Sequence, residues 1–150
     1  MKNQTFDAAL RSTWQMVSKM YNKEALKFDS TMATGFALLS IDPDGTPSTT
    51  LGPKMGIEPT SLSRLLNTME DRNLVYRSQN PEDGRSVLIH LTSFGIKKRE
   101  DSKSVVLHFN DMINQKLSDI QIQHFFEVMK CIKENVKNFE HFKHFKQTLN

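Results

Sequence analysis

The feature that most constrains the fold is a set of proline and glycine signals between residues 50 and 71. Pro59 suits the first position of a helix, because its missing N–H would have no partner there. Gly56, shortly before it, suits the left-handed conformation that ends a helix. Pro53 is tolerated if the preceding helix begins near Thr50, so that the proline lies in its first turn. This stretch therefore predicts a short helix, a tight turn and a second helix.

The second predicted helix, Pro59 to Asp71, has two different sides. Its apolar side consists of Leu62, Leu65, Leu66 and Met69. At about 100° per residue the opposite side carries Thr60, Arg64, Asn67 and Asp71, flanked by Ser61 and Thr68. A helix of this kind can anchor itself by its apolar side and place short polar side chains in the major groove of DNA. Any surface helix can show hydroxyls and one arginine, so this pattern alone is weak.

A β-hairpin is predicted directly downstream. Residues 74–79 and 86–91 favour strands, and the turn-forming residues 80–85 lie between them. Arg85 could reach into a narrow minor groove, where the negative potential is strongest. Asp83 could accept hydrogen bonds from Arg85 or from the turn backbone and hold the loop in shape. Without the preceding helices, a solvated surface hairpin would be the better interpretation.

Helices are also predicted on both sides of this region. They cover about residues 6–21, 31–41, 93–116 and 119–139, with Thr92 and Ser118 or Asp119 as N-caps for the last two. The last helix carries an apolar seam of Ile122, Phe125, Met129, Ile132, Val136 and Phe139, followed by Phe142 and Phe145. Such a seam requires a partner helix. We therefore expect the terminal helices of two copies to intertwine in a homodimer.

The length and composition of the chain agree with one soluble domain. A chain of 150 residues with 37% hydrophobic and 25% charged residues can bury a core without disulfides or metals. Its net charge of +3 permits a polyanionic partner without demanding one. The first residues lack the apolar stretch of a signal peptide, no apolar run is long enough to cross a membrane, and Cys131 is the single cysteine. A cytoplasmic location is expected, with Cys131 buried as a core residue.

Three segments together resemble a known family. They are residues 62–77, the turn 81–85 and the segment 91–95, which contains Leu91-Thr92 and Gly95. The Asp-x-Arg turn followed by Leu-Thr-x-x-Gly is similar to the winged helix-turn-helix regulators of the multiple-antibiotic-resistance regulator (MarR) family. The resemblance implies a mainly α fold with a small β-hairpin wing. It further implies a winged lobe over about residues 31–103 of a single domain, 1–150, and dimerisation helices over about 1–30 and 104–150.

The resemblance also implies a function. The chain would be a sequence-specific transcriptional regulator, acting as a repressor, whose dimer binds a pseudo-palindromic operator in double-stranded DNA. By carry-over, Arg85 would enter the minor groove, Asp83 would brace it, and Arg77 would support the wing or contact a phosphate. The candidate DNA-binding residues are Ser48, Lys54, Thr60, Ser61, Ser63, Arg64, Thr68, Arg77, Asp83 and Arg85. Among them Arg64 is the candidate for direct base readout, because its guanidinium can pair with guanine O6 and N7.

Regulation by a ligand is favoured over regulation by a thiol. Members of the family answer to a small phenolic or anionic ligand or to oxidation of a cysteine in the first helix, and this chain has no cysteine there. An apolar effector is a further possibility. Candidate pocket residues are Trp14, Tyr21, Met32 and Phe36, although such residues at helical spacing are more often core. No cofactor is expected.

Two other functions remain as alternatives. A winged helix can bind protein rather than DNA, because a fold does not determine its function. An enzyme is not expected, since no nucleophile–histidine–acid order, phosphate-binding glycine loop or metal-ligand cluster stands out. His141 and His144 could share a helix face toward a metal, but no third ligand is close in sequence, so no metal site is expected.

Overall fold

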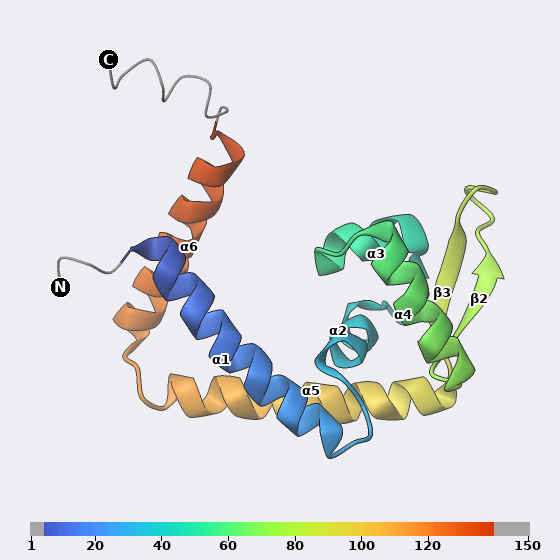
Figure 1. Cartoon of the computed structure of the whole chain (residues 1–150), viewed down its shortest axis with the longest axis horizontal. Helices are drawn as coiled ribbons and strands as arrows, with labels where there is room; N and C mark the ends of the chain where they lie inside the picture. Colours follow the sequence, from blue (N-terminus) through green and yellow to red (C-terminus); the bar gives the residue numbers. More distant parts are fainter. Residues whose placement is uncertain (1–4, 140–150) are drawn as a thin grey trace. The chain divides into compact units, whose positions relative to one another are not determined.

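The computed structural model describes residues 5–139 (Figure 1). Phe142, Phe145, His141 and His144 therefore lie outside the described residues. The helices are α1 (Phe6–Leu26), α2 (Met32–Ser40), α3 (Ser48–Met55), α4 (Pro59–Asp71), α5 (Ser93–Asn114) and α6 (Asp119–Lys137), and the strands are β1 (Thr46–Pro47), β2 (Val75–Gln79) and β3 (Val87–Leu91). The chain divides into two compact units, Met1–His108 and Phe109–Asn150.

The core of the first unit lies where α2, α3 and α4 meet the sheet. Its buried members are Ala37, Leu38, Ile41, Leu51, Leu62, Leu66, Met69, Leu74, Val75 and Ile89. The apolar side predicted for α4 is part of this core, with Leu62, Leu66 and Met69 buried and Leu65 packed against it. Burying these side chains is the main force that holds α4 in place.

The predicted hairpin is confirmed, and a third strand joins it. The antiparallel sheet has the order β1-β3-β2. β1, only two residues long, pairs Thr46 with Ile89 and Pro47 with Leu88. A strand this short has no alternation of apolar and polar residues, so the sequence carried no signal for it. It connects the α2–α3 segment to the wing.

The start of α3 differs from the prediction, and its end agrees. The helix begins at Ser48 rather than near Thr50, so Pro53 lies in the helix interior and not in its first turn. The carbonyl of Thr49 consequently lacks the usual N–H partner four residues later. Gly56 has a φ of 68° and ends the helix as predicted, and Pro59 opens α4.

The junctions around the wing depend on local capping. Asn73 adopts a φ of 56° after α4, a left-handed conformation that asparagine tolerates at the end of a helix. The Thr92 hydroxyl oxygen accepts a hydrogen bond from the Gly95 N–H at 2.9 Å, which confirms Thr92 as the N-cap of α5. The Thr92 hydroxyl donates to the backbone oxygen of Asn73 at 2.6 Å. The start of α5 is thereby tied to the end of α4.

The helix α6 in the second unit leaves much of its apolar seam exposed within the described chain. Ser118 and Gln121 form the capping box that starts it. No residue of α6 is buried, and the most exposed large apolar side chains include Ile120, Phe125, Phe126 and Val136. Cys131 is also exposed, so the expectation that it is a core residue of this chain was wrong. Its apolar neighbours Met129 and Ile132 are partly covered, whereas Cys131 lies on an exposed part of the helix.

None of the helices in the described part of the chain is long and apolar enough to cross a membrane.

Candidate nucleic-acid interface

The polar side of α4 is open to solvent. Its apolar residues point into the core, whereas Thr60, Ser61, Ser63, Arg64 and Thr68 are all exposed. The Thr68 hydroxyl donates to the backbone oxygen of Arg64 at 3.1 Å, a bond that keeps it close to the helix surface. No acidic side chain of residues 5–139 forms an ion pair with Arg64. The Arg64 guanidinium is therefore available to an acceptor outside the chain.

The tip of the wing is held in shape by its own side chains. Asp83 Oδ1 accepts a hydrogen bond from the Arg85 backbone N–H at 3.0 Å, as expected for a residue that braces the turn. The Asn80 side-chain amide donates to Ser86 Oγ at 2.8 Å, and its oxygen accepts from the Glu82 N–H at 3.0 Å. Asn80 and Ser86 are buried, whereas Asp83 and Arg85 are exposed. An ordered base thus presents the Arg85 side chain to solvent.

The Arg77 side chain connects the wing to α4. From β2 it forms an ion pair with Glu70, and its Nη2 donates to Asn67 Oδ1 at 2.8 Å. Neither partner was predicted. Residues 67 and 70 share one side of α4, but no sequence signal relates them to a strand that begins after the helix has ended. Arg77 therefore lies within the lobe's own polar network.

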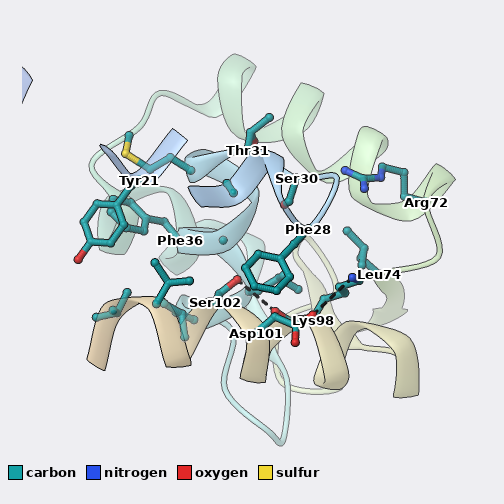
Figure 2. A pocket seen from close by; sticks show the side chains of 17 residues that line it. Tyr21, Phe28, Ser30, Thr31, Phe36, Arg72, Leu74, Lys98, Asp101 and Ser102 are labelled. Atoms are coloured by element: carbon teal, nitrogen blue, oxygen red, sulfur yellow. Dashed lines mark hydrogen bonds and ion pairs between the residues drawn. The ribbon is translucent and has the colours of Figure 1, made fainter. Parts of the chain in front are cut away.

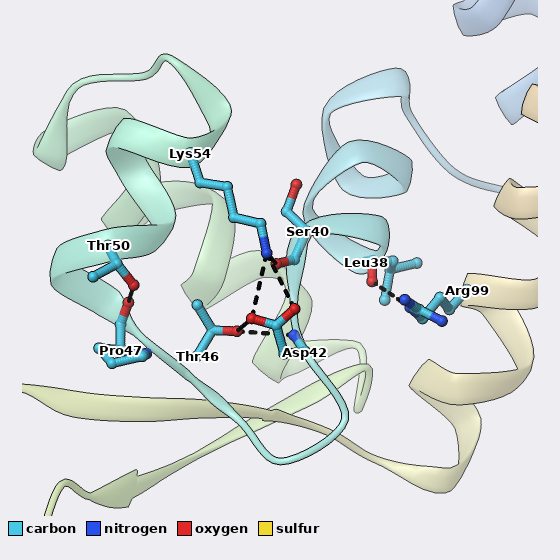
Figure 3. Close-up of polar contacts among 8 residues, drawn as sticks. All are labelled: Leu38, Ser40, Asp42, Thr46, Pro47, Thr50, Lys54 and Arg99. Carbon is cyan, nitrogen blue, oxygen red and sulfur yellow. Dashed lines mark hydrogen bonds and ion pairs between the residues drawn. The ribbon is translucent and has the colours of Figure 1, made fainter.

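Lys54 is also engaged within the lobe. Its ammonium group donates to the Ser40 backbone oxygen at 2.7 Å and to the two Asp42 carboxylate oxygens at 3.2 and 3.3 Å (Figure 3). The Lys54 ammonium and, after it, the Thr46 hydroxyl hold the pKa of Asp42 below its ordinary value. These contacts fasten α3 to the end of α2 and to the turn before β1. Ser48, a further candidate residue, is half-buried at the start of α3.

An apolar pocket lies on another side of this unit, between α1, α2 and α5 (Figure 2). Tyr21, Met32 and Phe36, three of the candidate pocket residues, line it. Trp14 does not line it, and instead lies with its ring centroid 6.3 Å from that of Phe36. Helical spacing placed Trp14 on the same helix as Tyr21, but two turns separate them, and the pocket begins only near Tyr21.

Two cationic side chains line this pocket, and the sequence did not reveal them. Lys98 lies with its Nζ 5.7 Å from the ring centroid of Phe94, 6.0 Å from that of Phe28, and 3.4 Å from Asp101 Oδ2. Arg72 donates to the backbone oxygen of Asp29, whose carboxylate is 3.5 Å away. Partial burial raises the pKa of Tyr21 above its ordinary value. The pocket therefore combines apolar walls, cations and a hydroxyl.

A short helix, a glycine turn, a second helix with an open polar side and a β-hairpin after it define a winged helix-turn-helix protein. The MarR family model matches residues 36–87, from within α2 to the first residue of β3. Over these residues the winged lobe of this chain is similar to the MarR family.

Sequence relatives extend the likeness beyond the lobe. The chain is 27% identical over 122 residues to YhbI, an HTH-type transcriptional regulator of Bacillus subtilis (strain 168), a match that covers 81% of this chain and 79% of the relative. It is 28% identical over 90 residues to YdgJ, an HTH-type transcriptional regulator of the same organism. That match covers 60% of this chain and spans only 55% of YdgJ.

Solved structures share the fold at lower identity. The S. aureus MepR–DNA complex matches with a TM-score of 0.80 at 20% identity, covering 89% of this chain and 99% of that one. CouR from Rhodococcus jostii RHA1, bound to p-coumaroyl-CoA, matches with a TM-score of 0.76 at 22% identity, covering 86% and 92%.

Proposed function

We propose that the chain is a sequence-specific DNA-binding regulator of transcription that acts in the cytoplasm as a repressor, without a catalytic step of its own. The observation that carries the proposal is the presence, on one lobe, of an exposed polar helix side and an exposed arginine at the tip of a braced hairpin. The DNA complex of MepR, which shares the fold, supports it. So do the two relatives that are transcriptional regulators.

In this proposal α4 reads the major groove and the wing reads the minor groove. Arg64 pairs with a guanine, and the hydroxyls of Thr60, Ser61 and Ser63 contact phosphates or base edges. Arg85 inserts into a narrow minor groove beside the same half-site. Arg77 and Lys54 act mainly within the protein, because each is already bound to a carboxylate of its own lobe.

We further propose that the regulator is a homodimer. The exposed apolar side chains of α6, and Phe6 and Trp14 of α1, lose contact with water if a second copy covers them. Residues 1–30 and 104–150 then form the dimerisation region, and residues 31–103 form the DNA-binding lobe. A two-fold axis between the lobes makes the operator a pseudo-palindrome, with half-sites about one helical turn, roughly 34–36 Å, apart.

Selection of bound fragments from random duplex DNA tests this proposal. The wild-type protein should recover inverted half-sites at that spacing. Arg64→Ala should recover the same spacing with the preference lost at one base position per half-site, and its affinity for the wild-type operator should fall by about 1–3 kcal/mol. An unchanged preference would remove Arg64 from base readout. Recovery of single half-sites without fixed spacing would contradict the dimer.

Release of DNA by a small ligand in the α1–α2–α5 pocket completes the proposal. The apolar walls suit a flat organic molecule, and an anionic or phenolic group on it would compete with Asp101 for Lys98 and with Asp29 for Arg72. Arg72 and Leu74 flank the end of α4, so a molecule in the pocket would contact the segment that joins the reading helix to the wing. CouR with p-coumaroyl-CoA shows that a protein of this fold can bind an organic ligand.

Lys98→Met should weaken binding of a phenolic anion while preserving the apolar stem. With 4-hydroxybenzoate as the probe, the dissociation constant measured by titration calorimetry should rise roughly tenfold, because a contact to a charged group is lost. The neutral analogue 4-hydroxybenzyl alcohol is the matched control and should change by less than about threefold. Equal losses for both probes would show that Lys98 does not recognise the anion.

A further inference from the structure

We propose that Glu70 and Asn67 of α4 are positioning residues that act through Arg77 to set the wing against the reading helix. This inference rests on the proposed function. Asn67 lies on the side of α4 that the sequence assigned to DNA, and Glu70 is an acidic residue on the same helix. In the structure both side chains bind the same guanidinium instead.

The two contacts of Arg77 restrict both the position and the orientation of β2 relative to α4. Residues 67 and 70 lie one turn apart on α4, about 4.5 Å along the helix axis. The planar guanidinium of Arg77 bonds to one of them through Nη1 and to the other through Nη2. A planar, two-pronged contact specifies orientation as well as distance. It therefore holds β2 at one height along α4, which a single ion pair would not do.

Arg77 also lies at the point where the hairpin passes from its buried part to its exposed tip. It pairs with Ile89, the buried residue of β3, whereas Gln79 and Val87, at the last strand pair before the tip, are exposed. From residue 78 to residue 87 the side-chain hydrogen bonds described for the hairpin stay within the hairpin itself. The Arg77 contacts are thus the last polar connection to α4 before the loop that carries Arg85.

Because Glu70 is negatively charged, the proposal can be tested by whether removing this charge weakens or tightens DNA binding. A carboxylate on a DNA-binding helix repels phosphates, so its removal should tighten binding if it is merely solvated. Removal should tighten binding further if Arg77 is a phosphate contact that Glu70 neutralises. A positioning role predicts the opposite, because the wing loses its fixed place and Arg85 no longer meets the minor groove in register.

Glu70→Gln should therefore weaken binding to the selected operator about fivefold or more, measured by fluorescence anisotropy at constant salt. Asp71→Asn is the charge-matched control: it removes the neighbouring exposed carboxylate, which forms no ion pair with the described residues, and should leave affinity unchanged or raise it. In an Arg85→Ala background the loss caused by Glu70→Gln should largely disappear, since both changes act through the wing. Unchanged or tighter binding by Glu70→Gln overturns the proposal, and so does a loss that persists in full without Arg85.

A readout without DNA separates this inference from the proposed function. Glu70→Gln should speed backbone hydrogen exchange in residues 75–91 while leaving α2 and α3 unchanged. Asp71→Asn should not speed it. Equal exchange in the wild type and Glu70→Gln would overturn the positioning role. Failure of the wild-type protein to bind any duplex would contradict the proposed function and leave the exchange result to decide the role of Glu70.

Discussion

Gly95→Ala is expected to lower the free energy of unfolding by about 3 kcal/mol, through overpacking at a site that cannot relax. A Cβ on Gly95 would lie 1.9 Å from the Leu74 backbone oxygen and 3.0 Å from its carbonyl carbon. That oxygen also accepts a hydrogen bond from the Thr92 N–H at 3.1 Å and lies 3.3 Å from the Thr92 hydroxyl oxygen. The carbonyl therefore cannot move away from the added methyl group without disturbing this hydrogen bond. Urea unfolding followed by circular dichroism measures the loss.

Gly84→Ala provides the control for this experiment. A Cβ at Gly84 meets no atom within 4 Å, and its backbone does not adopt a positive φ. Its effect should remain within about 0.5 kcal/mol. If Gly95→Ala were equally mild, the start of α5 would have to move away from the junction between α4 and β2 at little cost. The close approach would then not be needed for folding.

The second large effect expected is a fall of roughly 10³ to 10⁵-fold in operator affinity between 50 and 200 mM salt. A fall of this size corresponds to about six to ten phosphate contacts by the dimer, about three to five from each protomer, so cationic side chains besides Arg64 and Arg85 must contribute. The net charge of +3 is too small to produce this slope by general attraction alone, so its source must be local. Anisotropy titrations of a labelled operator at several salt concentrations give the slope directly.

A random duplex of the same length is the comparison for that titration. It should bind more weakly, with a salt slope of its own, because phosphate contacts need no particular sequence. The operator and the random duplex should differ most at physiological salt. A winged helix that binds protein need show no such slope, and a flat dependence on salt with either duplex would favour that alternative.

The parts of the candidate interface that were predictable depend on local chemistry. Pro59 and Gly56 mark the ends of two helices through the conformations that these residues permit. The spacing of Leu62, Leu66 and Met69 identifies the buried side of α4, and hence the open one. Asp83 braces the turn only two residues away from itself. Each of these signals involves residues that are close together in the sequence, so it can be recognised from the sequence alone.

The unpredicted parts depend on contacts between distant segments. Arg77 meets Glu70 and Asn67 only because β2 folds back along α4, and Lys54 meets Asp42 only because α3 packs beside the end of α2. The Lys98 cation and the predicted aromatic residues share one pocket for the same reason, while Trp14 lies outside it. The periodicity of α6 also indicated that its apolar seam requires a partner. It did not indicate whether the same chain provides that partner, and Cys131 is exposed in the structure.

The amino-acid sequence by itself determined where the helices and the hairpin form and which side of α4 turns to the core, because backbone preferences and hydrophobic burial act on neighbouring residues. Which charged side chains remain available to a partner depends instead on how distant segments pack together. A charged side chain that forms an ion pair within the protein is no longer available to a partner. When its partner residue lies in a distant segment, that ion pair depends on how the chain packs. Arg64 and Arg85 remain open to a partner, whereas Arg77 and Lys54 are held by the carboxylates of Glu70 and Asp42.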